Sequence, residues 1–185
     1  MAAGGYKISN KAGIHFVTFA VVEWVDVFTN KQYRDILLES LRYCQKYKGL
    51  QIYGWCIMSN HVHLVVAAAN NDTSEILRDF KKFTAREIIR AIRENPTESR
   101  KEWMLNIFNK MGASNSRNKQ YQFWRHTNQP KELFSQKFTQ QKLDYIHNNP
   151  VAAGIVESAA DYLYSSARDY DAGRSVGLLE IELLG

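Results

Sequence analysis

Hydrophobic and polar residues follow one another along the chain in patterns that predict both strands and helices. A run rich in β-branched and aromatic residues at 14–22 predicts a first strand. Hydrophobic positions three and four apart then predict a helix over 30–48, which Gly49 would end. Residues 50–69 form an apolar run that a polar pair at 59–60 interrupts, so we expect two strands to meet there.

The second half of the chain begins with the clearest helix start. Asp72 precedes Thr-Ser-Glu, residues that are favoured around a helix N-terminus, and helical spacing continues to Asn95. Pro96 would end this long helix, because a proline lacks the backbone N–H and clashes with the preceding turn. Later elements are expected as follows: a helix over 97–111, a loop at 112–116, a strand at 121–125, a helix from about Lys131 or Ser135 to Asn149 before Pro150, and a segment at 178–184 that packs as a short strand or stays loose.

The order strand, helix, two strands, helix, strand fits the split β-α-β layout of ferredoxin-like folds. We therefore expect an α+β fold in which an antiparallel sheet carries helices on one face, with a further C-terminal helix. A chain of 185 residues is long enough for one domain with its own core and short for two. The domain is expected to span 1–185, with a core at about 14–156 and a C-terminal extension at about 157–185.

Composition and charge narrow the class of protein. Hydrophobic residues make up 45% and charged residues 23%, as in ordinary soluble globular proteins. No apolar run reaches transmembrane length and the first residues lack a signal-peptide core, so we expect a cytoplasmic protein without a membrane partner. Cys44 and Cys56, the only cysteines, suit a reducing compartment. A net charge of +5 favours a polyanionic partner.

Two histidines separated by one residue stand out within the apolar run. Side chains alternate between the two faces of a strand, so His61 and His63 are expected to point to the same face. Two imidazoles side by side on a rigid strand are able to hold a metal ion. The alternative is a strand with two half-buried, hydrogen-bonded histidines, and the pair alone does not decide between these interpretations.

The long helix expected after Asp72 carries a row of positive charges at every fourth position. Such residues share one helix face, and the opposite face is apolar. Neighbouring acidic residues neutralise the row only partly, and a phosphate backbone would complete the neutralisation. The alternative is an ordinary solvated helix face. The row consists of Arg78, Lys82, Arg86 and Arg90, with Arg93 as its continuation.

The helix expected before Pro150 places three polar residues on one face. Gln141, Tyr145 and Asn149 are four residues apart. A tyrosine hydroxyl is a weak nucleophile at its ordinary pKa of about 10 unless a metal ion or a base assists it. Many tyrosines in such positions are only amphipathic packing residues, so this segment alone does not establish catalysis.

Taken together, these segments resemble the HUH single-tyrosine transposases, and specifically the REP-associated tyrosine transposases. The matching segments follow the family's order between about residues 14 and 170. Two departures are that Ser59 stands where many members have proline, and that residues 125–133 lack the commoner arginine-rich sequence. The matching segments are Val17-Thr18-Phe19, Met58-Ser59-Asn60-His61-Val62-His63-Leu64, Phe80-Lys81-Lys82-Phe83-Thr84-Ala85-Arg86, Phe123-Trp124, residues 145–156 and Tyr164-Ser165-Ser166-Ala167.

The resemblance implies a specific role for each of these residues. His61 and His63 match metal ligands, Asn149 matches a third ligand, and Tyr145 matches the nucleophile. The implied cofactor is Mg²⁺ or Mn²⁺, although zinc would also suit the histidines on chemistry alone. The implied reaction cleaves and rejoins single-stranded DNA through a 5′-phosphotyrosine intermediate, at hairpin (REP-like) sequences. The expected DNA contacts are Arg78, Lys82, Arg86, Arg90 and Arg125.

Two other functions remain open at this point. One is a non-catalytic or domesticated nucleic-acid-binding protein of the same fold, and the other is a metal hydrolase that uses the histidines alone. The combination of His61, His63 and Tyr145 favours the transposase, because a pure binding protein does not need all three. We expect the protein in the bacterial cytoplasm, associated with the nucleoid, as a monomer or a homodimer.

Overall fold

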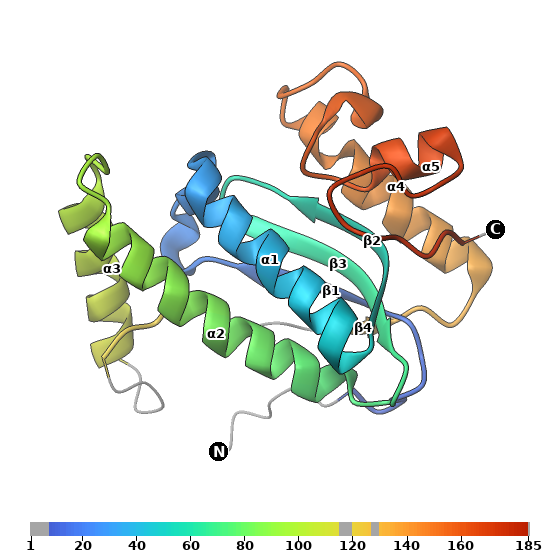
Figure 1. Cartoon of the computed structure of the whole chain (residues 1–185), viewed down its shortest axis with the longest axis horizontal. Coiled ribbons are helices and arrows are strands. Elements are labelled where there is room, and N and C mark those ends of the chain that lie inside the picture. The colour runs from blue at the N-terminus through green and yellow to red at the C-terminus, as the bar shows by residue number, and fades with distance from the viewer. Residues whose placement is uncertain (1–7, 115–119, 127–129, 185) are drawn as a thin grey trace.

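The computed structural model describes residues 8–114, 120–126 and 130–184. A four-stranded antiparallel sheet has the order β2-β3-β1-β4, and α1 and α2 lie side by side across one of its faces (Figure 1). This arrangement confirms the expected ferredoxin-like sheet with helices on one face. The strands and helices are β1 (His15–Ala20), α1 (Lys31–Lys48), β2 (Leu50–Ile57), β3 (His61–Ala68), α2 (Thr73–Glu94), α3 (Lys101–Ala113), β4 (Lys131–Glu132), α4 (Gln136–Ala152) and α5 (Ala167–Ala172), with short 3-10 helices at Val22–Trp24, Val27–Thr29 and Ala159–Asp161.

The main elements begin and end close to the predicted residues. The Asn30 side chain caps α1 by accepting from the Gln32 N–H at 3.0 Å, and the helix ends before Gly49, as predicted. The polar pair at 59–60 forms the turn between β2 and β3. The helix predicted from Asp72 to Asn95 is confirmed as α2.

The strand predicted at 121–125 is wrong. This segment is irregular and has one isolated β-bridge, between Val21 and Trp124. The neighbours Phe123 and Trp124 are both buried, whereas successive residues of a strand point to opposite faces. The fourth strand is instead the two-residue β4 (Lys131–Glu132), which pairs with β1.

The helix predicted at 97–111 begins and ends later than expected. It is α3, which starts at Lys101 and includes Gly112, so the loop predicted at 112–116 starts too early. A Cβ at Gly112 would lie 2.6 Å from the Gln120 carbonyl oxygen, so this position needs a residue without a side chain. Positions 115 and 116 of the predicted loop lie outside the described residues.

The sheet has an apolar cluster on each face. The larger cluster fills the space between the sheet and α1 and α2. The smaller one lies under α4, where Leu143 and Ile146 pack with Phe16, Cys56 and Val65. A Cβ at Gly54, where the pairing of β2 with β3 shifts register, would overlap Leu143 Cδ2. The bare backbone at this position therefore lets α4 approach the sheet closely.

The C-terminal segment, residues 157–184, covers the outer edge of β2. The Ile57 N–H donates to the Tyr164 carbonyl at 2.8 Å, and the Glu182 N–H donates to the Ile52 carbonyl at 2.9 Å. Residues 178–184 form no assigned strand, yet Ile181 among them is buried. Among the described residues, no helix is long and apolar enough to cross a membrane.

Candidate active site

Strand β3 presents the two histidines on the face of the sheet that α4 covers. The ring centroids of His61 and His63 are 4.7 Å apart in an edge-to-face arrangement. His63 is buried and lies opposite Thr18 of β1 in the antiparallel register. The Phe16 ring stacks on the His63 ring at 5.6 Å, which fixes the orientation of the imidazole. The two histidines therefore share a face, as their spacing predicted.

Each imidazole uses Nδ1 for a hydrogen bond within the protein. His61 Nδ1 lies 2.7 Å from Asn60 Oδ1, and an amide oxygen only accepts, so Nδ1 carries the proton. His63 Nδ1 forms a hydrogen bond of 2.7 Å with the Thr18 hydroxyl. Within the described part of the chain, the buried Nε2 of His63 has no hydrogen-bond partner. Histidines that bind metal commonly have one nitrogen held in this way and the other available.

Burial also keeps the two histidines neutral. Desolvation, followed by the nearby His61 and Lys142, lowers the pKa of His63 to about 3. Desolvation also lowers the pKa of His61. A neutral imidazole has the lone pair that a metal ion needs. At neutral pH the pair is therefore in the protonation state of metal ligands.

Helix α4 brings Tyr145 to the histidines. The Ser135 side chain caps this helix by accepting from the Phe138 N–H at 3.2 Å. The Tyr145 ring lies 5.5 Å from the His63 ring, centroid to centroid, and the tyrosine side chain is 53% exposed. The helix was predicted to end before Pro150, which is wrong: it continues to Ala152, because a proline in the last turn removes only one hydrogen bond.

Asn149 lies one helical turn beyond Tyr145, as predicted. Its side-chain Nδ2 donates to the Tyr145 carbonyl at 3.4 Å, so the amide is oriented along the helix. Among the residues that the structure describes, no hydrogen bond or ring contact joins Asn149 to either histidine. The structure thus brings together His61, His63 and Tyr145 and leaves Asn149 beside the tyrosine.

The donor set fits a divalent metal ion that uses few protein ligands. The described residues contain no group of three or more His, Cys, Asp or Glu side chains that could hold a metal ion. His61 and His63 offer their Nε2 atoms, and the orphaned, buried Nε2 of His63 needs a partner. An amide oxygen such as that of Asn149 would make the third protein ligand.

The predicted basic row lies on the other side of the sheet, on α2. Glu87 accepts from Arg86 at 3.0 Å and also from Arg90, and Arg78 pairs with Glu75 at 2.9 Å. A groove of about 560 Å³ runs between α2 and the segment at 120–126. Arg78 does not line this groove, whereas its basic lining residues include Lys81, Lys82, Arg86, Arg90 and Arg93.

Arg125 connects this groove to the histidine face. The Lys81 ammonium donates to the Arg125 carbonyl at 3.2 Å. The Arg125 guanidinium lies 5.1 Å from the centre of the Trp24 ring, and the Trp24 ring lies 6.1 Å from the His61 ring. Arg125 and the exposed Trp24 ring therefore connect the positive residues of α2 with the histidines at the end of the sheet.

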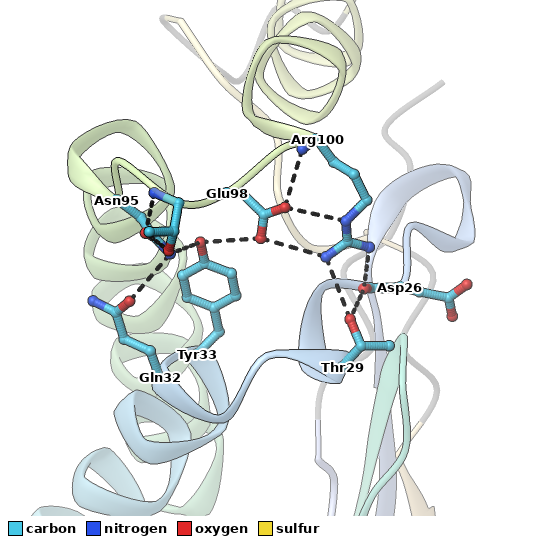
Figure 2. A network of polar contacts seen from close by, with 8 residues as sticks. Asp26, Thr29, Gln32, Tyr33, Asn95, Glu98 and Arg100 are labelled. Atoms are coloured by element: carbon cyan, nitrogen blue, oxygen red, sulfur yellow. Dashed lines mark hydrogen bonds and ion pairs between the residues drawn. The ribbon is translucent and has the colours of Figure 1, made fainter.

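A polar network joins Asp26 and Thr29, between β1 and α1, to Arg100 at the start of α3 (Figure 2). Asp26 accepts from Asn60 Nδ2 at 3.1 Å, and Asn60 in turn orients His61. The Arg100 guanidinium donates to the Asp26 carbonyl at 3.0 Å and to Thr29 at 3.3 Å (Figure 2). Glu98 accepts from Arg100 at 3.2 Å, which fixes the arginine. The turn after β1 is thus anchored to the start of α3.

Several residues of the site were not identified from the sequence. Thr18 and Asn60 hold the histidines, Lys142 places its ammonium 5.6 Å from the centre of the Tyr145 ring, and Trp24 lies beside His61. The register of β1 against β3 would have indicated Thr18, because it lies directly opposite His63. The other three depend on how loops and helices pack, which the local pattern does not encode.

Comparisons with known proteins agree with this fold. A family described as IS200-like transposases matches residues 9–110, more than half of the sequence, and the chain therefore belongs to this family. Its members are enzymes that act on single-stranded DNA. Within this class, the predicted resemblance to the REP-associated tyrosine transposases is confirmed.

Two relatives carry that more specific resemblance. A relative from Haemophilus influenzae that is named a REP-associated tyrosine transposase is 26% identical over 158 residues, which are 84% of this chain and 80% of the relative. A solved structure of a REP-associated tyrosine transposase bound to a REP hairpin covers 98% of this chain and 94% of its own, with a TM-score of 0.64 and 17% identity. At that identity, the solved structure supports the fold.

Proposed function

We propose that this chain cleaves and rejoins single-stranded DNA through a 5′-phosphotyrosine intermediate on Tyr145, at hairpin-containing, REP-like sequences of the nucleoid. The observation that carries the proposal is the 5.5 Å approach of the Tyr145 ring to His63. The buried His63 Nε2 has no partner among the described residues, which suits a metal-dependent reaction. The hairpin in the solved relative supports this class of DNA.

In the proposed step, the Tyr145 hydroxyl oxygen attacks the scissile phosphorus. The new O–P bond forms as the bond from phosphorus to the 3′ oxygen breaks. The phenolic proton passes to solvent, and the departing 3′ oxygen takes up a proton from solvent to become a hydroxyl. The Lys142 ammonium lies 5.6 Å from the centre of the Tyr145 ring, where its positive charge would attract the scissile phosphate. One phosphodiester replaces another, so a 3′-hydroxyl can reverse the step.

The metal site would be formed by His61 and His63 through Nε2, with the Asn149 amide oxygen as a third ligand. A bound Mg²⁺ or Mn²⁺ supplies positive charge that stabilises the charge developing on the phosphate and the leaving oxygen. Imidazole ligands suit Mn²⁺ better than Mg²⁺, which prefers oxygen and retains its waters. The neutral state of both imidazoles supports this role.

The DNA backbone would follow the positive residues of α2 and reach the site past Arg125. The groove residues Arg86 and Arg90 and the exposed Lys82 would contact phosphates, with Arg78 further along the helix. Each phosphate neutralised on a single strand adds about 0.7 to the salt-dependence slope. Arg86→Ala and Arg90→Ala should therefore each weaken binding and flatten that slope. An unchanged slope would mean that this face of α2 is an ordinary solvated helix face that does not contact DNA.

The catalytic proposal is tested by trapping the covalent intermediate. The protein is incubated with labelled single-stranded DNA that contains a candidate REP-type hairpin and Mn²⁺ or Mg²⁺, and adducts that survive denaturation are counted. Wild type should form an adduct, Tyr145→Phe should form none, and Tyr162→Phe serves as a tyrosine control on the C-terminal segment. Equal adduct in wild type and Tyr145→Phe would assign the nucleophile to another residue. No adduct in either protein across a set of hairpins would favour a non-catalytic DNA-binding protein.

A further inference from the structure

The turn after β1 holds an exposed tryptophan in a strained backbone conformation. Glu23 and Trp24 have φ angles of 52° and 54°, in the left-handed region that side chains with a Cβ disfavour. The Trp24 side chain is nevertheless 52% exposed, so it contributes little to the core. Backbone strain that surrounding structure maintains is typical of functional sites.

Trp24 forms one wall of a cavity at the end of the sheet. The cavity has a volume of about 470 Å³, within the usual range of small-ligand sites. Its other lining residues include Glu23, Gln122, Arg125 and His126. These side chains carry both donors and acceptors, which suit the polar edge of a nucleobase. The Trp24 ring offers the flat surface on which a base stacks.

The cavity lies next to the candidate active site. The Trp24 and His61 rings are 6.1 Å apart, centroid to centroid, in an edge-to-face arrangement. Asn60 joins them directly, because its Nδ2 donates to the Trp24 carbonyl at 3.2 Å while its Oδ1 accepts from His61. The Arg125 guanidinium, 5.1 Å from the Trp24 ring centre, adds the positive charge that a phosphate needs. A base on Trp24 would therefore place its own phosphate close to His61.

We infer that the cavity between Trp24 and residues 122–126 binds the nucleobase that flanks the scissile phosphate, with the base stacked on the Trp24 indole. The base site itself rests on the proposed function only in that the chain binds single-stranded DNA, whereas its role in selecting the cut rests on the proposed cleavage. The stacked base fixes which phosphate faces Tyr145 and His63. The cavity thereby helps to select the position of the cut.

The inference is tested by fluorescence with full-length Tyr145→Phe protein, in which no covalent adduct forms. Single-stranded dT12 is titrated in at low salt. A base stacked on Trp24 should quench part of the tryptophan emission, and Trp24→Phe should remove this quenching. Trp103→Phe is the matched control, because Trp103 is 53% exposed on α3 and lies outside the cavity. The decrease in emission intensity that dT12 causes in Trp103→Phe should equal the decrease in the parent protein.

A second measurement locates the stacked base. One abasic nucleotide is moved along dT12, and the affinity is measured at each position. At the stacked position the abasic strand should bind about tenfold more weakly, the loss expected for one stacked base. Trp24→Ala should bind intact dT12 about tenfold more weakly, with no further loss from the abasic site. Trp24→Phe should retain most of the affinity.

The outcomes separate this inference from the proposed function. If dT12 binds and Trp24 is not quenched, or if Trp24→Ala shows the same abasic profile as its parent, the cavity is not a base site and the proposed function stands. If Trp24 is quenched and the protein with Tyr145 intact forms no adduct with any hairpin, the proposed cleavage fails and the base site stands. If dT12 does not bind and a hairpin strand still forms an adduct, the base site is overturned and the proposed function stands. If neither strand binds, both are overturned.

Discussion

At the scale of single residues, the candidate metal site depends on which nitrogen each histidine presents. An imidazole with Nδ1 in a hydrogen bond as donor leaves its Nε2 lone pair for a metal ion. For His61 the acceptor is Asn60, and for His63 the partner is Thr18. If the Thr18 hydroxyl is lost, the proton on His63 can move from Nδ1 to Nε2, which then has no lone pair for a metal ion.

Thr18→Val should therefore weaken metal binding while it leaves both histidines in place. We expect a loss of about 10–100-fold in Mn²⁺ affinity, as for other residues that orient a metal ligand. Thr18→Ser retains the hydroxyl and should bind Mn²⁺ like wild type. Titration of Mn²⁺ followed by electron paramagnetic resonance gives both affinities. Equal affinity in wild type and Thr18→Val would mean that Thr18 does not control the tautomer.

Lys81 should give the proposed DNA-binding groove on α2 a pH dependence. Burial lowers the pKa of its ammonium to about 8, so Lys81 is charged below that pH and becomes neutral above it. Since Lys81 lines the groove on α2, a rise from pH 7 to pH 9 removes one positive charge from the DNA path. We expect the affinity for dT12 to fall over this range, with a salt slope reduced by up to about 0.7.

Two variants of neighbouring lysines test this explanation. Lys81→Met should bind dT12 more weakly at pH 7 and lose the change between pH 7 and pH 9. Lys82→Met removes an exposed positive charge from the same groove and leaves Lys81 in place, so its pH dependence should persist. Fluorescence anisotropy of labelled dT12 measures both. A pH dependence that survives in Lys81→Met would have to come from another group.

The candidate site residues could be selected from the sequence, and the residues that hold them in place could not. His61 and His63 share a strand face because side chains alternate, and Tyr145 follows from the motif. The contact between Tyr145 and His63 depends on two elements that are distant in sequence. The same holds for Lys81, because its lowered pKa results from burial in the folded chain.

At the scale of elements, the site depends on how closely α4 lies against the sheet. Gly54 in β2 meets Leu143 of α4, so a larger residue at 54 would push the helix outward. Because Tyr145 is on the same helix, such a shift separates its ring from His63. The distance between the proposed nucleophile and the proposed metal ligand is thus set by a glycine in a neighbouring strand.

Gly54→Ala should therefore lower both stability and adduct formation. We expect a loss of about 1–3 kcal/mol in the free energy of unfolding, the usual effect of overpacking. Gly54→Ala combined with Leu143→Ala creates room for the new methyl group, so the double variant should lose less than the sum of the two single losses. Urea denaturation and the adduct assay measure the two effects. Additive losses of unfolding free energy would mean that residues 54 and 143 do not contact each other in the folded protein.

Element boundaries were predictable where local signals were strong. Asn30 and Gly49 delimit α1, and the polar pair at 59–60 separates β2 from β3, as the pattern predicted. The strand predicted at 121–125 failed, because the buried Phe123 and Trp124 pack against other aromatic rings rather than in a ladder. Pro150 did not end α4, since one missing hydrogen bond in the last turn is tolerated.

At the scale of the whole molecule, a single chain assembles the candidate site. His61, His63 and Tyr145 approach one another without a second copy, although they come from β3 and α4. The outer edge of β2 is covered by the C-terminal segment through hydrogen bonds such as that from Ile57 N–H to the Tyr164 carbonyl, at 2.8 Å. A covered edge is not available to extend the sheet into another molecule.

This arrangement predicts that two differently inactivated chains do not rescue each other. Tyr145→Phe retains the histidines and His63→Ala retains the tyrosine, so a mixture would regain activity only if one chain lent its tyrosine to the other. With the site in one chain, we expect no adduct above that of the separate variants. His63→Ala carries a tag that changes its size, so an adduct on that chain would be visible on a denaturing gel.

The mixture needs a control for inhibition by inactive chains. With DNA in excess over total protein, wild type mixed with an excess of either variant should form as much adduct as wild type alone, because each molecule would act on its own strand. An adduct on the tagged His63→Ala chain in the presence of Tyr145→Phe would instead show that the tyrosine works on the partner's histidines. That result would require α4 to leave the sheet, and Gly54→Ala, which weakens the same contact, should then increase the rescue.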